Sequence, residues 1–289
     1  MKEIAIIGST ASGKTALSIE IAQKTNSIIL SLDSLSVYKE IDIASAKPTK
    51  EERGDIIHFG IDVVYPNNEF DVTQFINLYK QAKQFAQNNN KNLIIVGGTS
   101  FYLKALTDGL SQGIKKKFPL DIPKEEAYDL LYNLDKTYME NIKRNDTYRI
   151  QKAYEIFKVT NKTPSQYFEE NQKIPVAKDL KIFEILWEKE ELRQRIKLRT
   201  KQMIEEGIID EVINLESKYT RKPNCMSSIG IVETLEYLDG KISKEILEEK
   251  IALNTSKLAK RQNTFNKGQF QNKTSNIIKN LNSEILKFF

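Results

Sequence analysis

The sequence holds very few of the residues that build disulfide frameworks or metal centres. Among its 289 residues it has one cysteine, Cys225, and one histidine, His58. A single cysteine excludes an internal disulfide and a cysteine-rich zinc site, and a single histidine excludes a His-rich metal site. The fold must therefore be stabilised by its hydrophobic core, as is usual for proteins of the reducing cytoplasm.

Long apolar runs are also missing. No stretch approaches the roughly 20 apolar residues that a membrane-spanning helix requires. The first residues, Met1 to Ile4, lack the layout of a signal peptide. The hydrophobic fraction of 40% and the charged fraction of 29% are ordinary for a globular protein. We expect a soluble, monomeric, cytoplasmic protein without a membrane partner.

Short apolar runs alternate with helical patterns through the first hundred residues. The run Ile4 to Ile7 is followed by glycine and is typical of a buried parallel strand. Similar patterns predict strands at 27–32, 58–64 and 93–96 and helices at 14–24 and 71–87. Strands that alternate with helices form parallel sheets covered on both faces, so we predict an α/β fold.

The pattern changes near Ser111. From about 115 to 178 the sequence has helical patterns rich in Tyr, Lys and Asn, and 179–187 is typical of a strand that returns to the sheet. A last strand is predicted near 275–278 and a last helix at 283–289. We therefore predict a catalytic core formed by residues 1–111 and 178–289, with a small all-helical insertion at 112–177.

A phosphate-binding loop follows the first predicted strand. It fits the pattern G-x-x-x-x-G-K-[ST], between a buried strand and an amphipathic helix, which indicates a P-loop NTPase-like fold. The glycines let successive N–H groups face an anion, and the helix adds its positive N-terminal end. The lysine supplies a cation, and the last hydroxyl suits a phosphate oxygen or Mg²⁺. The loop residues are Gly8, Ser9, Thr10, Ala11, Ser12, Gly13, Lys14 and Thr15.

Asp33 lies at the carboxyl end of the second predicted strand, beside the phosphate loop. Open α/β sheets place their sites at this edge. The carboxylate could accept a proton from a nucleophile, hold Mg²⁺ as a Walker-B aspartate does, or cap a turn. All three interpretations remain open at this point.

The third strand ends in Gly97-Gly98-Thr99, where an ATPase would carry a Walker-B acid. Two glycines and a hydroxyl leave room for a substrate and supply one hydrogen-bond donor. The sequence therefore departs from the usual machinery of phosphoryl transfer.

The net charge of +5 permits a nucleic-acid partner without requiring one. Two stretches gather basic side chains. The stretch from Tyr148 to Lys152 mixes aromatic and basic residues, which suits base stacking and phosphate contact. Lys260 and Arg261 belong to a basic stripe on a later helix, where a phosphate track and a solvated face are both reasonable interpretations.

The phosphate loop is the first of a series of motifs that spans nearly the whole chain. The others are Ser31-Leu32-Asp33-Ser34, Asp42-Ile43-Ala44-Ser45-Ala46-Lys47-Pro48, Val96-Gly97-Gly98-Thr99, Arg144-Asn145-Asp146, Leu192-x-x-Arg195-Ile196-x-x-Arg199 and Leu258-Ala259-Lys260-Arg261-Gln262. Together they resemble the bacterial tRNA dimethylallyltransferases. Their joint presence is far more specific than the loop alone.

The resemblance implies a reaction. A dimethylallyl group passes from dimethylallyl diphosphate to N6 of adenosine 37 in tRNAs that read codons beginning with U, and pyrophosphate leaves with the assistance of Mg²⁺. Asp33 then takes the role of general base, and the phosphate loop holds the diphosphate, with Thr15 as a metal ligand. Thr99 is a further donor, and Arg195 or Arg199 a bidentate clamp.

The resemblance also implies that adenosine 37 of the anticodon stem-loop is flipped out of its stack into a channel. The expected tRNA-contacting residues are those of the channel, of the aromatic and basic helix and of the basic stripe: Asp33, Ser34, Leu35, Ser36, Tyr148, Arg149, Ile150, Gln151, Lys152, Lys260 and Arg261.

Two departures and three alternatives accompany this interpretation. The family usually has Gly-Tyr-Arg where this chain has Gly230-Ile231-Val232, and Gly-Thr where it has Ala44-Ser45.

The phosphate loop alone would favour a nucleotide or metabolite kinase that binds ATP. A prenyltransferase acting on free adenine nucleotides is a related alternative, which the basic helices disfavour. A nucleotide switch or RNA-binding module without chemistry is the third, which the loop and Asp33 together disfavour.

Overall fold

The computed structural model describes residues 1–111, 114 and 118–289. Its contacts divide the chain into two compact units, Met1–Lys104 with Asp179–Phe289, and Ala105–Lys178. The second unit begins at Ala105, before the residue 112 suggested by the sequence, because Leu106 is hydrogen-bonded to the end of the helical unit. There the Val176 and Ala177 N–H groups both donate to the Leu106 carbonyl. No helix among the described residues is long and apolar enough to span a bilayer.

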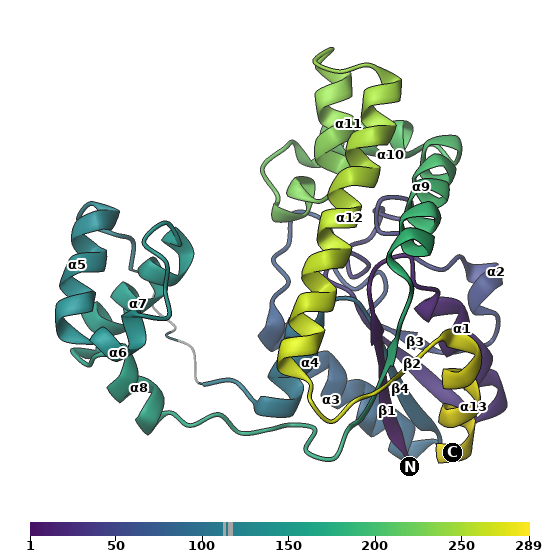
Figure 1. Ribbon diagram of the computed structural model, residues 1–289, viewed down its shortest axis with the longest axis horizontal. Helices are drawn as coiled ribbons and strands as arrows, with labels where there is room; N and C mark the ends of the chain where they lie inside the picture. The colour runs from purple at the N-terminus through teal and green to yellow at the C-terminus, as the bar shows by residue number, and fades with distance from the viewer. Residues whose placement is uncertain (112–113, 115–117) are drawn as a thin grey trace. The chain divides into compact units, whose positions relative to one another are not determined.

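The larger unit is built on a parallel sheet, which confirms the predicted fold class (Figure 1). The strand order is β3-β2-β4-β1-β5-β6, and every pairing is parallel. The strands are β1 Glu3–Gly8, β2 Ser27–Leu32, β3 His58–Phe59, β4 Asn92–Gly97, β5 Lys181–Ile185 and β6 Thr274–Asn276. The strand predicted at 58–64 was therefore too long, and the central strands lie where the apolar runs predicted them.

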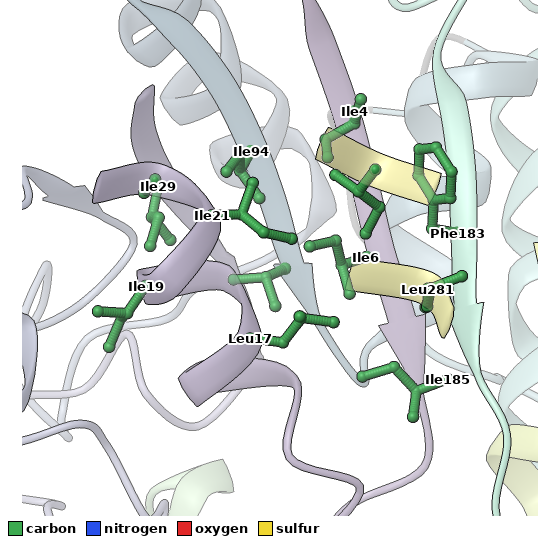
Figure 2. Close-up of a cluster of buried hydrophobic side chains, with 13 residues drawn as sticks. Ile4, Ile6, Leu17, Ile19, Ile21, Ile29, Ile94, Phe183, Ile185 and Leu281 are labelled. Atoms are coloured by element: carbon green, nitrogen blue, oxygen red, sulfur yellow. The ribbon is translucent and has the colours of Figure 1, made fainter. Parts of the chain in front are cut away.

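Both faces of the sheet are covered by helices. Ile4 and Ile6 of β1 point to a cluster formed with α1 (Lys14–Lys24) and α13 (Ile278–Phe288), which Figure 2 shows. The alternate residue Glu3 accepts a hydrogen bond from Tyr79 of α3 (Val72–Asn88), so α3 lies on the opposite face. This two-sided burial explains why the strand sequence is apolar throughout rather than alternating.

The second half of the chain adds helices around the carboxyl edge of the sheet. Helix α12 (Lys244–Gln269) packs along α9 (Lys189–Glu205) through Ala259 against Leu192 and Ile196. A separate core joins the segment from Val37 to Ala44 to α10 (Ile208–Tyr219), the 3-10 turn η1 (Asn224–Ser227) and α11 (Ile231–Leu238). The first half of the chain also contains two short helices, α2 (Lys50–Arg53) and α4 (Ser100–Asp108).

The smaller unit is helical and has its own core. It consists of α5 (Lys124–Leu134), α6 (Lys136–Met139), α7 (Thr147–Thr160) and α8 (Pro164–Glu170). Leu131, Ile150 and Tyr154 are almost completely buried there. Tyr154 is therefore part of this core, whereas Tyr148 is exposed.

The ends of β2 and β4 approach each other closely. Leu32 is paired with Gly97, and a Cβ atom built on Gly97 would lie 2.1 Å from the Leu32 carbonyl oxygen. Real contacts of this kind are never so short, so only glycine fits here. The pairing brings Asp33, which follows Leu32 directly, and Thr99, two residues after Gly97, to the same edge of the sheet.

The substitution Gly97→Ala is expected to destabilise the fold by at least about 1–3 kcal/mol, because a backbone carbonyl of the central sheet would have to move. Urea denaturation measures the change. Gly268→Ala is the matched control, because it lies in α12 with nothing within 4 Å of the added Cβ. It should leave stability unchanged or raise it by about 0.5–1 kcal/mol. Equal stability of the two variants would contradict the close approach.

Candidate active site

The phosphate loop is held from outside by side chains distant in sequence. Trp187 donates its indole N–H to the Ser12 carbonyl (3.0 Å), and Arg195 donates Nε to the Ala11 carbonyl (2.8 Å). The Arg195 guanidinium also stacks over the Trp187 ring at 4.5 Å. Gly13, at the start of α1, has φ +85°, which favours glycine. Two loop carbonyls are thus turned outward, which leaves the N-terminal end of α1 open to an anion.

The Lys14 side chain folds back onto the loop and donates hydrogen bonds to other loop residues. Its Nζ donates to the Ser9 carbonyl (2.6 Å) and to Ser12 Oγ (3.4 Å). Burial and, to a smaller extent, the positive charge of Arg199 lower the pKa of Lys14 to about 7, against the opposing effect of Asp33. The ammonium is therefore strongly desolvated and close to another cation, a state that a bound anion would relieve.

The two arginines of the predicted clamp take different positions. Arg199 donates Nη1 to Thr10 Oγ1 (3.2 Å), and burial lowers its pKa, although the guanidinium stays charged. The Nε of Arg195 donates to the loop, and its guanidinium plane stacks on Trp187, as described above. Arg199 is thus the arginine that faces the cavity beside the loop, and Arg195 supports the loop from the other side.

Asp33 both caps a turn and keeps one oxygen available. Its Oδ1 accepts N–H bonds from Leu35 (2.8 Å) and Ser36 (3.2 Å). Within the described residues Oδ2 has no hydrogen-bond partner, and Asp33 lines the cavity next to the phosphate loop. The carboxylate is therefore oriented by two backbone donors and presents a second oxygen for proton transfer.

Thr99 lies next to this carboxylate. The Ser34 N–H donates to Thr99 Oγ1 (3.1 Å), and the Thr99 N–H donates to the Leu32 carbonyl (3.1 Å). The turn that orients Asp33 is thus tied to the end of β4. Asp33, Ser34 and Thr99 form one polar corner, and we keep the name Asp33 corner for these three residues.

The Asp33 corner and the phosphate loop line one cavity of about 600 Å³. A second cavity of about 540 Å³ lies against Ala11 and Gly13 on the other side of the loop. Lys14, Thr15 and Arg199 line both. Of the predicted site residues, those lining the first cavity are Thr10, Lys14, Thr15, Asp33, Ser34, Leu35, Ser36, Thr99, Arg199 and Arg261.

The remaining predicted residues lie elsewhere. In the helical unit Tyr148 is 72% exposed, and Arg149 forms an ion pair with Asp146 beside it. Ile150 is fully buried, so its side chain supports α7 and is not available to a polynucleotide. Gln151 and Lys152 both reach Glu155. Lys260 is exposed on α12.

Three residues without a predicted role shape the site. Trp187 holds the phosphate loop through its indole N–H. Gln262, quoted only within a motif, accepts from the Thr10 N–H (2.8 Å) and donates to the Gly98 carbonyl (3.0 Å). Glu211 accepts the N–H groups of 42–44 at 2.7–2.9 Å and so fixes the wall at 44–46. No local pattern marks these roles, because each partner is far away in sequence.

The segment Gly230-Ile231-Val232 begins α11 rather than presenting a long polar side chain. Gly230 has φ +94°, and its N–H donates to Glu233 Oε2 (2.7 Å). Ile231 is buried in the core, and Ser227, Ser228 and Ile229 are the nearby residues that line the cavity.

The residues at the loop fit a divalent cation that arrives with phosphate. The described residues contain no group of three or more acidic, His or Cys side chains that could hold a metal by themselves. Thr15 supplies a hydroxyl and Asp33 a carboxylate to the same cavity. Mg²⁺ is commonly held by one or two such groups together with substrate phosphates and water.

Comparison with known proteins agrees with this geometry. The tRNA dimethylallyltransferase of Aliarcobacter butzleri is 74% identical over 289 residues, covering 100% of this chain and 99% of that protein. The protein of the same name from Sulfurimonas denitrificans is 52% identical and covers 99% of both chains.

Solved structures extend the likeness to the fold. A eukaryotic dimethylallyltransferase acting on tRNA superposes with a TM-score of 0.82 at 28% identity, over 92% of this chain and 70% of that chain. The tRNA isopentenylpyrophosphate transferase of Bacillus halodurans gives 0.75 at 28% identity, over 99% and 95%. The model of the IPP transferase family matches residues 36–269. The chain therefore belongs to the IPP transferase family.

Proposed function

We propose that the protein is a tRNA dimethylallyltransferase, which transfers the dimethylallyl group of dimethylallyl diphosphate to N6 of adenosine 37 in the anticodon stem-loop. One observation carries the proposal: a phosphate-binding loop and an oriented carboxylate line the same cavity. A prenyl donor needs the loop for its diphosphate, and an adenine amine needs an acceptor for its proton. The names of the relatives support the same reaction.

In this reaction the C–O bond between the dimethylallyl carbon and the diphosphate breaks while a C–N bond to N6 forms. The amine loses one proton, which passes to Asp33 Oδ2 and then to water. The Leu35 and Ser36 N–H groups hold the carboxylate in position by its other oxygen. A positioned base of this kind typically contributes about 100- to 10,000-fold to the rate.

The phosphate loop stabilises the leaving group. Negative charge accumulates on the pyrophosphate as the C–O bond breaks, and the N-terminal end of α1, Lys14 and Arg199 are already directed toward that place. Thr15 and the diphosphate would hold Mg²⁺, which adds positive charge there. At the end of β4, Thr99 replaces a Walker-B acid, which favours alkyl transfer over phosphoryl transfer.

Two surfaces suit the tRNA. On α12, Lys260 and Arg261 are exposed, and Arg261 lines the cavity. In the helical insertion, Tyr148 and Arg149 are exposed on α7, where an aromatic ring and a guanidinium suit bases and phosphates. We expect an active monomer, in the cytoplasm where tRNA is found.

The direct test is incubation with labelled dimethylallyl diphosphate, Mg²⁺ and unmodified tRNA carrying adenosines at positions 36 to 38. Label is expected on the tRNA and in a digest on N6 of adenosine 37. Label on free AMP, or turnover of ATP in place of transfer, would show that the proposed function is wrong.

The role of Asp33 can be separated from its role as a cap. The substitution Asp33→Asn keeps an oxygen for the Leu35 and Ser36 N–H groups and removes the base. Transfer should slow by about 100- to 10,000-fold in single-turnover assays, while binding of pyrophosphate persists. Asp55→Asn, at an exposed position, is the matched control. Unchanged transfer by Asp33→Asn would assign Asp33 to the turn alone.

Binding of inorganic pyrophosphate should take up a proton near neutral pH. Lys14 has a pKa of about 7 in the free protein, and a bound anion raises it. Below pH 7 Lys14 is already charged, and above pH 7 binding must recharge it, so affinity should fall as the pH rises. Calorimetry in buffers of different ionisation enthalpy measures the uptake.

Lys14→Arg is the control for this measurement, because arginine stays charged over the whole range. Titration of pyrophosphate itself affects both proteins equally. The wild type should therefore lose more affinity than Lys14→Arg between pH 7 and 9. Parallel profiles for the two proteins would contradict a neutral Lys14 in the free state.

A further inference from the structure

Gln262 of α12 connects two parts of the active site that are far apart in sequence. Its Oε1 accepts the Thr10 N–H at 2.8 Å, and its Nε2 donates to the Gly98 carbonyl at 3.0 Å. These partners lie 252 and 164 residues away along the chain. One side-chain amide thus links the phosphate loop to the end of β4.

Each end of this link continues to a group of the proposed reaction. Thr10 Oγ1 accepts a hydrogen bond from Arg199, which lines the cavity where the leaving group would be bound. Gly98 precedes Thr99, whose hydroxyl accepts the Ser34 N–H and so ties down the Asp33 corner. The amide therefore sets the separation between the diphosphate cradle and the base.

The helix that carries Gln262 is itself fixed to the core on both sides. One turn earlier, Ala259 is buried against Leu192 and Ile196 of α9. One turn later, the buried Asn266 donates to Glu184 of β5 at 2.9 Å. Gln262 is thus held by a rigid element between two anchors, rather than by a free loop.

Gly98 is matched to this amide. A Cβ atom built on Gly98 would lie 2.5 Å from Gln262 Nε2, and the three nearest heavy atoms all belong to Gln262. Gly98 is not among the positive-φ residues, so its backbone does not require glycine. The space that Gly98 leaves open is the space that the Gln262 amide occupies.

We propose that Gln262 is a positioning residue, which holds the phosphate loop and the Asp33 corner at the separation that in-line transfer of the prenyl group requires. This inference rests on the proposed function. Reacting atoms must lie about 3–3.5 Å apart, and a displacement of 1 Å can cost roughly 100-fold in rate. Gln262 touches neither reacting atom and acts through Thr10 and Gly98.

The test is a double-mutant cycle of Gln262→Ala and Gly98→Ala, with single-turnover transfer to tRNA as the readout. Each single variant should slow transfer about 10- to 100-fold, because the first removes the amide and the second displaces it. The double variant should be no slower than Gln262→Ala within about threefold, because the methyl group added at position 98 then has no amide to clash with. Losses that multiply would overturn the proposal.

Two further measurements separate positioning from folding. The pyrophosphate dissociation constant of Gln262→Ala should change by less than about threefold, because Lys14 and Arg199 are intact. Gln269→Ala, an exposed glutamine of the same helix, should transfer at the wild-type rate. Should Gln262→Ala fail to fold, Gln262→Met keeps the length and apolar packing and removes the amide. As a single variant it should slow transfer about 10- to 100-fold and change the pyrophosphate dissociation constant by less than about threefold.

Hydrogen exchange of the Thr10 amide tests the link without the reaction. The amide should be protected in the wild type and exchange faster in Gln262→Ala. If the wild type does not modify tRNA, the proposed function is wrong, and protection of Thr10 still decides whether the link exists. If transfer occurs and Thr10 exchanges equally in both proteins, the link is absent.

Discussion

The hydrogen-bonded pairing of β2 with β4 determines where the chemistry can take place. Leu32 and Gly97 meet at the end of that pairing, so Asp33, one residue on, and Thr99, two residues on, lie at the same edge. The distance is so short that the second strand must end in glycine. The long helix α12, added later in the chain, is placed against the edge that these two strands have already defined.

Electrostatics at this edge is arranged for an anion. Burial disfavours the charge of both Lys14 and Arg199, and Arg199 lies close enough to disfavour the charge of Lys14 further. Asp33 compensates only in part. A protein that holds two cations in this way expends folding free energy to keep a site ready, and the anion regains it on binding. The Trp187 and Arg195 contacts keep the loop open despite that repulsion.

Local sequence patterns located the central sheet and the main site residues, because those depend on neighbours in the chain. Apolar runs marked β1, β2 and β4, and the loop motif marked Lys14. The ends of the sheet were less predictable: β3 has two residues, and α13 begins at Ile278 rather than 283. Gln262, Trp187 and Glu211 gained their roles from partners more than 150 residues away, which no local periodicity records.

The order of strands has a consequence for synthesis of the protein. β1 pairs on one side with β4 but on the other with β5, which begins at residue 181, after the helical unit. Its apolar face is closed by Leu281 and Ile285 of α13. On the ribosome the first strand therefore keeps an open edge until β5 has emerged, and its face, packed by α1, is not fully covered until α13 follows. Such a nascent chain depends on delayed collapse or on chaperones to avoid aggregation.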